Sequence, residues 1–404
     1  MHQNRVCTPR LCVPPASRTV AVAAAIVAAL ALGGCANFPL GGRSGENIRG
    51  GYAQGDKVAL LLPVAGPYAG VAESVRAGVR SASDADDTGA APKLATVDSD
   101  DPKQVTEAYL KAVGEGATHV IGPLQKPSVD ALAAGQALKV PTLALNEGTF
   151  AGRPAANFFQ FSLSPETDAA EVANKAHAQG FTRALMLYPD DSGGNRRADA
   201  FRNQWRKLGG GLVGEAAFAT DAASYTPTVT GLLAKGGADF IFLAANAEQA
   251  RAIYPQIRQG AGPTPVIATS DVYAGDVNPS RDKALAGLYF VDMPWMLDLA
   301  TEDEPLRRAE LKKVPAYLST PLGRRLYVMG IDAYRLAPRL GVLAANPAAT
   351  FPGQTGILSV DGLGRVRRSL KLGRFTETGP APVSGIRPGR MTSLTRTPRP
   401  EPAS

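Results

Sequence analysis

One serine and one lysine stand at the spacing of an acyl-transfer pair. Ser280-Arg281-Asp282-Lys283 matches the S-x-x-K pattern, in which the lysine activates the serine hydroxyl as a nucleophile. That chemistry also requires S-D-N and K-T-G motifs, and neither occurs in the sequence. The segment follows Asn278-Pro279 in a polar stretch, so we interpret it as a solvated loop.

The other residue types that could support catalysis or bind a metal are also poorly placed. His2 precedes the apolar N-terminal segment, His119 begins a predicted strand, and His177 lies on a predicted helix. Without cysteine partners these histidines do not predict a zinc site. Aspartates cluster at 84–87 and 98–101, but not at the spacing of a calcium loop. We therefore expect no enzymatic activity, no metal and no cofactor.

The N-terminal segment predicts lipid attachment at Cys35. Three arginines and no acidic residue precede thirteen apolar residues, Val20–Leu32, which are too few to span a bilayer as a helix. Leu32-Gly33-Gly34-Cys35 then resembles a bacterial lipobox. We expect residues 1–34 to be a lipoprotein signal peptide and Cys35 to carry the lipid anchor. An uncleaved anchor helix is the alternative, and the order of charged, apolar and small residues favours cleavage.

Cysteine content and charge restrict the protein's class further. Cys7 and Cys12 lie in the predicted leader, so no disulfide is expected in the mature chain. The net charge of +7 divides unevenly: the leader carries +3, the part from Arg365 onward carries +7, and residues 36–364 carry −3. A mildly acidic body argues against nucleic-acid binding, which requires a basic face on the folded domain.

Short apolar runs that alternate with helical segments predict an α/β fold. Each run has four to seven residues with little polar alternation, as parallel strands covered on both faces require. The runs are VALLLP (58–63), KLATV (93–97), THVIGP (118–123), PTLALN (141–146), RALMLYP (183–189), DFIFLAA (239–245) and PVIATS (265–270). Between them, Ser164-Pro165 predicts the start of a helix. We expect doubly wound, mostly parallel sheets flanked by helices.

Several segments depart from this alternation. NFFQFSLS (157–164) and LYFVDMPWM (288–296) are extended, and we expect them to cross between two lobes rather than to be strands of one sheet. A hairpin is predicted around Asp361-Gly362. Residues 35–55 are Gly-rich and polar and predict a flexible tether. Residues 376–404 are rich in Pro, Arg and Thr, which predicts a disordered tail.

Several sequence blocks resemble the penicillin-binding protein activator lipoproteins. They occur in the family's order from residue 57 to about 375, and the most specific are IGPLQKPSV, FLAANAEQAR and DMPWM. The resemblance implies a two-lobed type I periplasmic-binding-protein-like fold. It further implies a lipoprotein on the periplasmic face of the outer membrane, with roles in peptidoglycan synthesis and cell shape, that binds and activates a class A penicillin-binding protein, a bifunctional peptidoglycan synthase. Ala36 agrees with the outer membrane, because aspartate after the lipidated cysteine is the usual signal for inner-membrane retention.

Two departures from the family pattern stand out. The longer members carry a helical-repeat domain before this fold, whereas only the predicted tether precedes it here. The family's Trp-Gly pair after the RALMLYP-type strand is replaced by Asp191-Ser192-Gly193-Gly194-Asn195-Arg196. The first departure leaves open how the tether reaches the partner, and the second leaves open the role of this loop in the cleft.

In such a fold, ligands bind between the lobes at the carboxyl ends of the strands. We expect a first lobe of about 56–160 and 291–345 and a second of about 161–290 and 350–375. The cleft candidates are Pro67, Tyr68, Gln125, Lys126, Ser128, Asn146, Glu147, Thr149, Asp190, Asn246, Asp271 and Tyr273. A solute-binding lipoprotein of an ABC transporter, of the amino-acid type, is the alternative function, with a small molecule in this cleft. The loop after the third strand, PLQKP, lacks the hydroxyl pair that such receptors use for a carboxylate, which favours a repurposed cleft.

The last predicted hairpin carries four arginines. We expect Arg365, Arg367, Arg368 and Arg374 to form a basic strip on folded structure. Such a strip is suited to an acidic partner or an anionic glycan, although a solvated edge that prevents strand pairing is an equal alternative.

Overall fold

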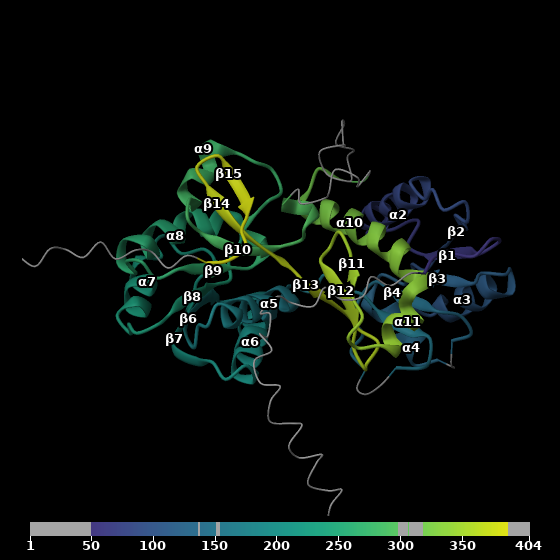
Figure 1. The fold of residues 1–404 in the computed structure, drawn as a ribbon, viewed down its shortest axis with the longest axis horizontal. Coiled ribbons are helices and arrows are strands. Elements are labelled where there is room, and N and C mark those ends of the chain that lie inside the picture. The colour runs from purple at the N-terminus through teal and green to yellow at the C-terminus, as the bar shows by residue number, and fades with distance from the viewer. Residues whose placement is uncertain (1–49, 136–137, 151–153, 298–305, 307–317, 387–404) are drawn as a thin grey trace, which may run out of the picture. The chain divides into compact units, whose positions relative to one another are not determined.

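Five parallel strands form the first sheet of the computed structural model, which describes residues 50–135, 138–150, 154–297, 306 and 318–386 (Figure 1). The order β2-β1-β3-β4-β5 is formed by β1 (Lys57–Leu61), β2 (Lys93–Val97), β3 (His119–Ile121), β4 (Thr142–Ala144) and β5 (Phe158–Gln160). The connecting helices are α2 (Ala69–Asp84), α3 (Val105–Gly114) and α4 (Lys126–Ala133). β1 to β4 coincide with predicted apolar runs, and their parallel pairing confirms that prediction. We call this sheet with its helices the first lobe.

The second lobe is built on a seven-stranded sheet in the order β15-β14-β10-β9-β8-β6-β7. Its strands are β6 (Arg183–Pro189), β7 (Gly211–Phe218), β8 (Phe240–Leu243), β9 (Val266–Ala268), β10 (Tyr289–Asp292), β14 (Lys371–Thr376) and β15 (Gly379–Pro382). Its helices are α5 (Pro165–Ala178), α6 (Ser192–Lys207), α7 (Thr226–Leu233), α8 (Ala247–Gly260) and the short α9 (Pro279–Asp282). β6, β8 and β9 match predicted runs. On one side of the sheet, Phe201 stacks on Phe242 with ring centroids 4.2 Å apart and secures α6.

The predicted hairpin around Asp361-Gly362 is confirmed. β12 (Ile357–Val360) and β13 (Val366–Ser369) pair antiparallel, and β11 (Phe351–Pro352) completes a three-stranded sheet. This sheet lies against the first lobe, because the amide of Gln160 in β5 donates to the carbonyl oxygen of Gly364 at 2.9 Å. The structure divides residues 350–375, which were predicted as part of the second lobe: β11 to β13 form their own sheet beside β5, and β14 joins the second sheet.

The segments expected only to cross between lobes contain strands. Phe158–Gln160 is β5 at one edge of the first sheet, and Tyr289–Asp292 is β10 inside the second sheet. The chain changes lobe after each of these strands. β5 of the first lobe is followed by α5 of the second, and β10 of the second lobe is followed by α10 (Pro321–Leu336), which packs on α2 of the first. The first lobe thus resumes after β10, not at 291. Both sheets lie in one compact unit of the chain.

Two glycines allow α10 to approach α2 closely. A Cβ atom on Gly78 would lie 1.9 Å from the carbonyl oxygen of Tyr327, and one on Gly330 would lie 2.2 Å from that of Val75. Only hydrogen fits at these positions, so the two helix backbones are in contact. The remaining helix, α11 (Leu340–Ala345), follows α10 after one 3₁₀ turn. The close crossing fixes the side chains of α10 relative to the first lobe.

The folded part extends beyond both of its predicted ends. Tyr52, assigned to the flexible tether, is buried, and its hydroxyl donates to the carbonyl oxygen of Tyr334 at 2.8 Å. Thr376 is not the start of the tail, because β15 pairs with β14 and Ile386 is buried. The predicted signal peptide, Cys35 and residues 387–404 lie outside the described residues. None of the helices in the described ranges has the length and apolar character needed to cross a membrane.

Candidate functional site at the junction of the two lobes

Most cleft candidates of the first lobe hold their own loops. Gln125 donates to Asp100 at 3.2 Å, and Asn146 donates to the carbonyl oxygen of Leu124 at 3.1 Å. Thr149 donates from its amide and hydroxyl to Asp130, at 2.6 and 2.8 Å. Of the five further candidates, Pro67, Tyr68 and Lys126 are exposed. Ser128 is buried, and Glu147 accepts a hydrogen bond from Ser162 at 2.9 Å. These residues therefore order the loops at the strand ends.

The second-lobe candidates are divided in the same way. Asn246 caps α8 by accepting from the amides of Glu248 and Gln249, at 3.0 and 2.9 Å. Asp190 is exposed, and Tyr273 is buried against Phe290 and Phe375. Asp271 accepts from Arg197 at 2.7 Å. Of the twelve candidates, Asp271 is the one that lines the pocket between the lobes.

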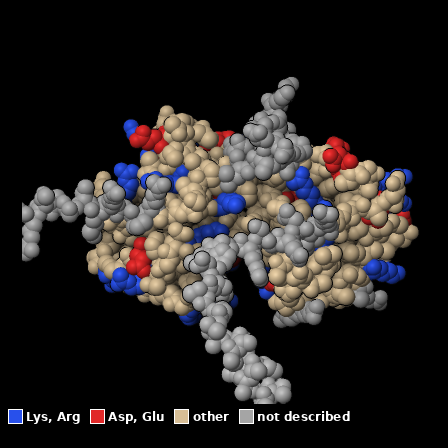
Figure 2. Space-filling model, viewed as in Figure 1, with Lys and Arg blue, Asp and Glu red and all other residues tan. Residues whose placement is uncertain are grey.

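That pocket has a volume of about 240 Å³ and is lined by charged residues from both lobes. The lining residues are Leu163, Pro165, Asp168, Ser270, Asp271, Asp292, Met293, Pro321, Leu322, Arg325, Arg368 and Leu370. On the face drawn in Figure 2, basic side chains (blue) lie near the middle, in the region where Figure 1 places β10, β13 and α10. The junction is therefore polar, although apolar cores flank it in both lobes.

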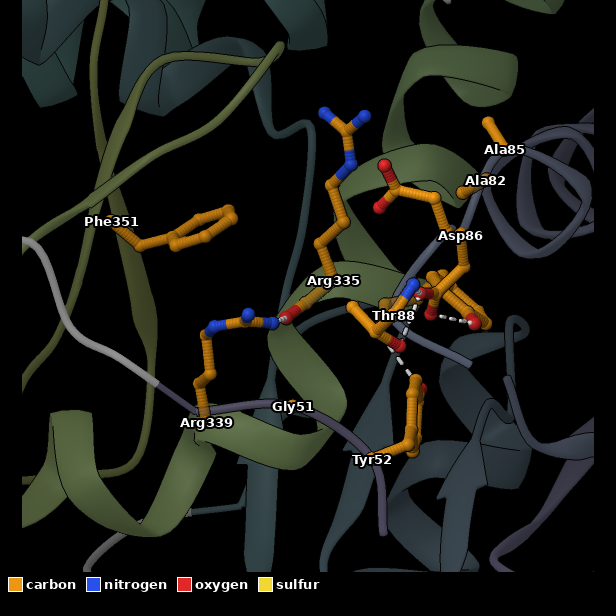
Figure 3. A pocket seen from close by; sticks show the side chains of 11 residues that line it. Gly51, Tyr52, Ala82, Ala85, Asp86, Thr88, Arg335, Arg339 and Phe351 are labelled. Atoms are coloured by element: carbon orange, nitrogen blue, oxygen red, sulfur yellow. Dashed lines mark hydrogen bonds between the residues drawn. The ribbon is translucent and has the colours of Figure 1, made fainter. Parts of the chain in front are cut away.

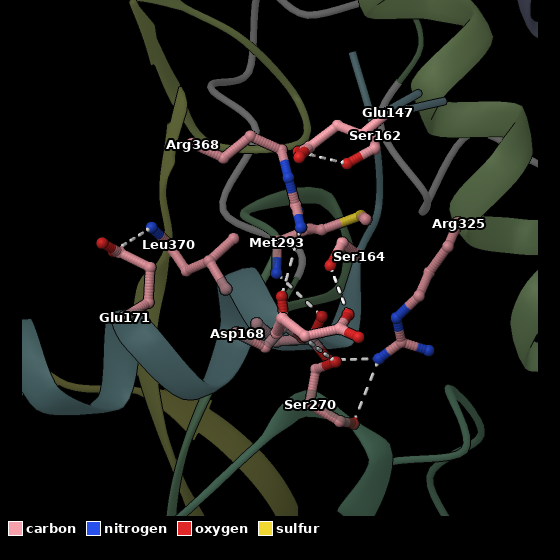
Figure 4. Close-up of polar contacts among 12 residues, drawn as sticks. Glu147, Ser162, Ser164, Asp168, Glu171, Ser270, Met293, Arg325, Arg368 and Leu370 are labelled. Carbon is pink, nitrogen blue, oxygen red and sulfur yellow. Dashed lines mark hydrogen bonds and ion pairs between the residues drawn. The ribbon is translucent and has the colours of Figure 1, made fainter. Parts of the chain in front are cut away.

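Two arginines connect the lobes through buried carboxylates. Arg325 of α10 donates to Asp292 at the end of β10 at 2.8 Å, and to the carbonyl oxygen of Ser270 at 3.2 Å. Arg368 of β13 donates to Asp168 of α5 at 3.2 Å, and the Ser270 hydroxyl donates to the same carboxylate. Figure 4 shows Arg325 and Arg368 entering this network from different sides, with Asp168 and Ser270 between them. We call these five residues the junction network.

Burial controls the protonation of the two carboxylates. Removal from water raises the pKa of Asp292 to about 7, although Arg325 and the amide of Met293 oppose the shift. Burial also raises the pKa of Asp168, against the opposing effects of Arg368 and the Ser270 hydroxyl. Asp168 adds to the rise in the pKa of Asp292, and Asp271 adds to the rise in the pKa of Asp168. The network therefore takes up a proton near neutral pH.

One side of the network has unused donors. Nε and Nη1 of Arg368 are buried and have no hydrogen-bond partner among the described residues, although Nη2 is bound to Asp168. A buried donor without an acceptor costs about 1–3 kcal/mol. The site can therefore accept an oxygen atom, from water or from a small solute.

The predicted basic strip does not form. Arg368 is only 4% exposed, and Arg365 and Arg367 both pair with Asp361, at 3.1 and 2.7 Å. Arg374 lies on β14 of the other sheet, 5.3 Å from the ring centroid of Tyr289. The strip prediction was wrong because it treated all four side chains as outward-facing. In β13 the residues alternate, and Arg368 shares the inward face with Val366.

A second polar hollow, of about 270 Å³, lies where the described chain begins (Figure 3). Tyr334 donates to Asp86 at 2.6 Å, and Asp86 accepts from the Thr88 hydroxyl at 2.6 Å. The Arg339 guanidinium lies 5.3 Å from the centroid of the Phe351 ring, and it donates to the carbonyl oxygen of Arg335. The Tyr52 hydroxyl donates to the carbonyl oxygen of Tyr334 in the same place, so these contacts together have a structural role.

Comparisons with known proteins relate the chain to one family. The model of the family described as "LppC putative lipoprotein" matches residues 52–378. The protein named penicillin-binding protein activator LpoA from Photobacterium profundum is 28% identical over 360 residues, which cover 82% of this chain and 58% of that protein. The protein of that name from Erwinia tasmaniensis is 30% identical over 323 residues, covering 68% and 46%. The chain thus spans about half the length of these curated relatives.

Solved structures confirm the fold. The C-domain of LpoA from Haemophilus influenzae, a regulator of PBP1A, superposes with a TM-score of 0.67 at 23% identity, covering 81% of this chain and all of that one. A structure described as a putative branched-chain amino acid ABC transporter from Chromobacterium violaceum gives a TM-score of 0.63 at 31% identity, covering 79% and 99%. The fold is therefore that of the type I periplasmic binding proteins. Because the family model matches most of its length, the chain belongs to the LppC lipoprotein family.

Proposed function

We propose that this protein is a non-enzymatic lipoprotein that binds and activates a class A penicillin-binding protein, and so regulates peptidoglycan synthesis. The names of its relatives support this function, since both are called penicillin-binding protein activators. The lipobox at Cys35 followed by Ala36 supports an anchor in the outer membrane with the folded part in the periplasm.

The observation that carries the proposal is the junction network. A solute receptor of this fold opens and closes around its ligand, which requires lobes that separate. Here Arg325 joins Asp292, and Arg368 joins Asp168, through contacts that occupy the space between the lobes. Breaking such buried pairs leaves uncompensated charges. The arrangement favours a protein that presents a fixed surface to a partner.

The second candidate function is that of an amino-acid-type solute receptor. Two observations favour it: the 31% identity to nearly the whole Chromobacterium violaceum structure, and the unused donors of Arg368 beside the pocket. Against it, the loop after β3 offers Gln125 and Lys126, and Gln125 is bound to Asp100. A pocket of about 240 Å³ is below the usual range of about 300–1,000 Å³ for small-molecule sites.

One pair of measurements separates the two functions. Glycan-strand synthesis by a purified class A penicillin-binding protein from the same organism is followed with and without the full-length lipoprotein in detergent. We expect a severalfold higher rate, with the heat-denatured lipoprotein as control. In parallel, the melting temperature is measured with the twenty amino acids at millimolar concentration, where a receptor gains about 2.7 kcal/mol at a hundredfold excess over Kd. If the synthase is not stimulated and an amino acid raises the melting temperature, the solute-receptor function is correct and the activator function is wrong.

The membrane assignment has its own test. Fractionation is expected to place the wild-type protein in the outer membrane and the Cys35→Ala variant in the soluble periplasm, because the variant has no acceptor for the lipid. Recovery of the wild-type protein in the inner membrane would contradict the outer-membrane assignment without affecting the proposed partner.

A further inference from the structure

An apolar hollow lies where α2 and α10 begin side by side. It has a volume of about 480 Å³ and is lined by the first turns of both helices. The lining residues are Gly70, Val71, Glu73, Ser74, Thr320, Leu322, Gly323 and Leu326. Because the helix backbones are in contact at Gly78 and Gly330, the hollow lies between two packed helices of the first lobe.

Large apolar side chains are exposed on the wall of this hollow and in the loop that leads into α2. Leu322 is 57% exposed on its wall, and Tyr68 and Val64 are 48% and 51% exposed in the loop that leads into α2. Exposed apolar residues are ordinary when they are scattered, but a group of them around an apolar depression is typical of a protein–protein contact. The cores of such contacts are formed by leucine-sized and aromatic anchors that fill a hollow on the partner.

The loop that leads into α2, and so to the wall of the hollow, is flanked by acidic side chains. Asp98 accepts from the amide of Val64 at 3.2 Å, and Asp100 lies within 2.9 Å of the Cβ position of Gly66, so both carboxylates flank the loop that carries Tyr68. Asp101 is exposed beside them. The ion pairs found among the described residues include none of these three aspartates. A partner that covers the hollow therefore needs basic groups to meet them.

We propose that this hollow docks the activated synthase: the partner inserts one or two apolar side chains between the first turns of α2 and α10, and places lysine or arginine against Asp98, Asp100 and Asp101. This inference rests on the proposed function. With Arg368 buried and Arg365 and Arg367 paired to Asp361, the hollow takes the place of the predicted basic strip as the contact surface. We call it the docking hollow.

The test measures binding of full-length variants to the purified class A synthase. Leu322→Asp is expected to weaken Kd at least about tenfold, since a buried apolar anchor is replaced by a charge. The fold should be kept, because Leu322 is 57% exposed and an acidic residue is favourable in the first turn of a helix. Since Leu322 also lines the junction pocket, urea denaturation of the variant must give the wild-type free energy of unfolding before its Kd is compared. Leu110→Asp on α3 and Val342→Asp on α11, each at a position 52% exposed, are matched controls that should bind as the wild type does.

A second arm tests the acidic side chains beside this loop. Replacing Asp98, Asp100 and Asp101 by Asn keeps their acceptor oxygens and removes the charge, so association should slow severalfold at low salt and much less at high salt. Equal binding by the wild type, Leu322→Asp and the triple Asn variant would overturn the docking hollow while leaving the activator function intact. Absence of binding by the wild type itself would overturn both. Concentration-dependent dimers that Leu322→Asp abolishes would assign the hollow to a second copy of this chain instead.

Discussion

Arg325 and Asp292 form an ion pair between the two lobes, with Nη2 of the arginine 2.8 Å from Oδ2 of the aspartate. The arginine comes from α10, which packs on α2 of the first lobe, and the aspartate ends β10 inside the sheet of the second lobe. Asp292 is fully buried, and its other oxygen accepts from the amide of Met293 at 2.8 Å. This ion pair therefore joins the two lobes directly.

Removing the arginine should destabilise the protein more at high pH than at low pH. Arg325→Met leaves the Asp292 carboxylate buried without a cation, which costs about 3 kcal/mol of unfolding free energy when the carboxylate is ionised. At pH 6 the carboxyl group is mostly protonated, since its pKa is about 7, and the loss should be smaller. Urea denaturation of both proteins at pH 6 and pH 8 measures the difference. The double variant Arg325→Met with Asp292→Asn should recover part of the loss, whereas equal losses at the two pH values would contradict this account.

The stability of the wild-type protein should fall as pH rises from about 4 to about 7. Unfolded Asp292 titrates near 3.8, and burial raises its pKa to about 7 in the folded state, so the folded state binds more protons between these values. Its contribution is fully present below about pH 4 and is lost as pH rises through about 7. Asp168, whose pKa is also raised by burial, acts in the same direction.

Asp292→Asn should make this slope shallower, since the amide does not titrate. The measurement is the free energy of unfolding at half-unit steps from pH 4.5 to pH 8. Burial opposes the shift, but hydrogen bonds from Ser164 and Arg196 outweigh it and lower the pKa of Glu166, which makes this residue the matched control. Glu166→Gln should leave the slope above about pH 5.5 unchanged, because this carboxylate is ionised there in both the folded and the unfolded state. An identical slope in the wild type and Asp292→Asn would show that Asp292 does not cause the pH dependence of the free energy of unfolding.

Asp332 should be a larger determinant of stability than its position inside a helix suggests. Its two buried oxygens accept from the amides of Gln354 and Thr355, at 2.8 and 2.7 Å, and from the Thr355 hydroxyl at 2.6 Å. These bonds attach the three-stranded sheet to α10. Asp332→Ala leaves three buried donors without acceptors and should lower the free energy of unfolding by about 3 kcal/mol or more. Thr355→Val removes one of these bonds and should cost about 1 kcal/mol, so equal losses would contradict this assignment.

The sequence predicted the strands better than it predicted the junction. All seven apolar runs form strands. Six are largely buried, which leaves a continuous apolar signal, whereas β2 is an exposed edge strand whose run was apolar all the same. β7 (Gly211–Phe218) gave no such signal, since it is an edge strand with most side chains partly exposed. Asp292 and Arg325 are single charged residues far apart in the chain, and nothing local indicates that they pair.

Two junction residues did carry a local signal. In β13 the alternation Val366, Arg368, Leu370 assigns the arginine to the inward face, and in α5 Asp168 precedes Val172 by one turn on the buried face. A charged residue in phase with an apolar face indicates a buried pair. Most cleft candidates instead hold their own loops, because polar loop residues at strand ends bind their own backbone as readily as a ligand.

The end of the folded part provides the last prediction. β15 pairs with β14, and the amide of Ile386 donates to the side chain of Gln179 at 3.0 Å, which attaches residues 379–386 to α5. Deletion of 379–404 should therefore lower the melting temperature by several degrees, because it exposes the edge of β14 and the site of the buried Ile386 side chain. Deletion of 387–404 is the matched control: its Pro- and Arg-rich composition predicts disorder, so the melting temperature should not change. Differential scanning calorimetry of the two truncations decides the boundary. If the shorter deletion lowers the melting temperature as much as the longer one does, the folded part continues beyond Ile386.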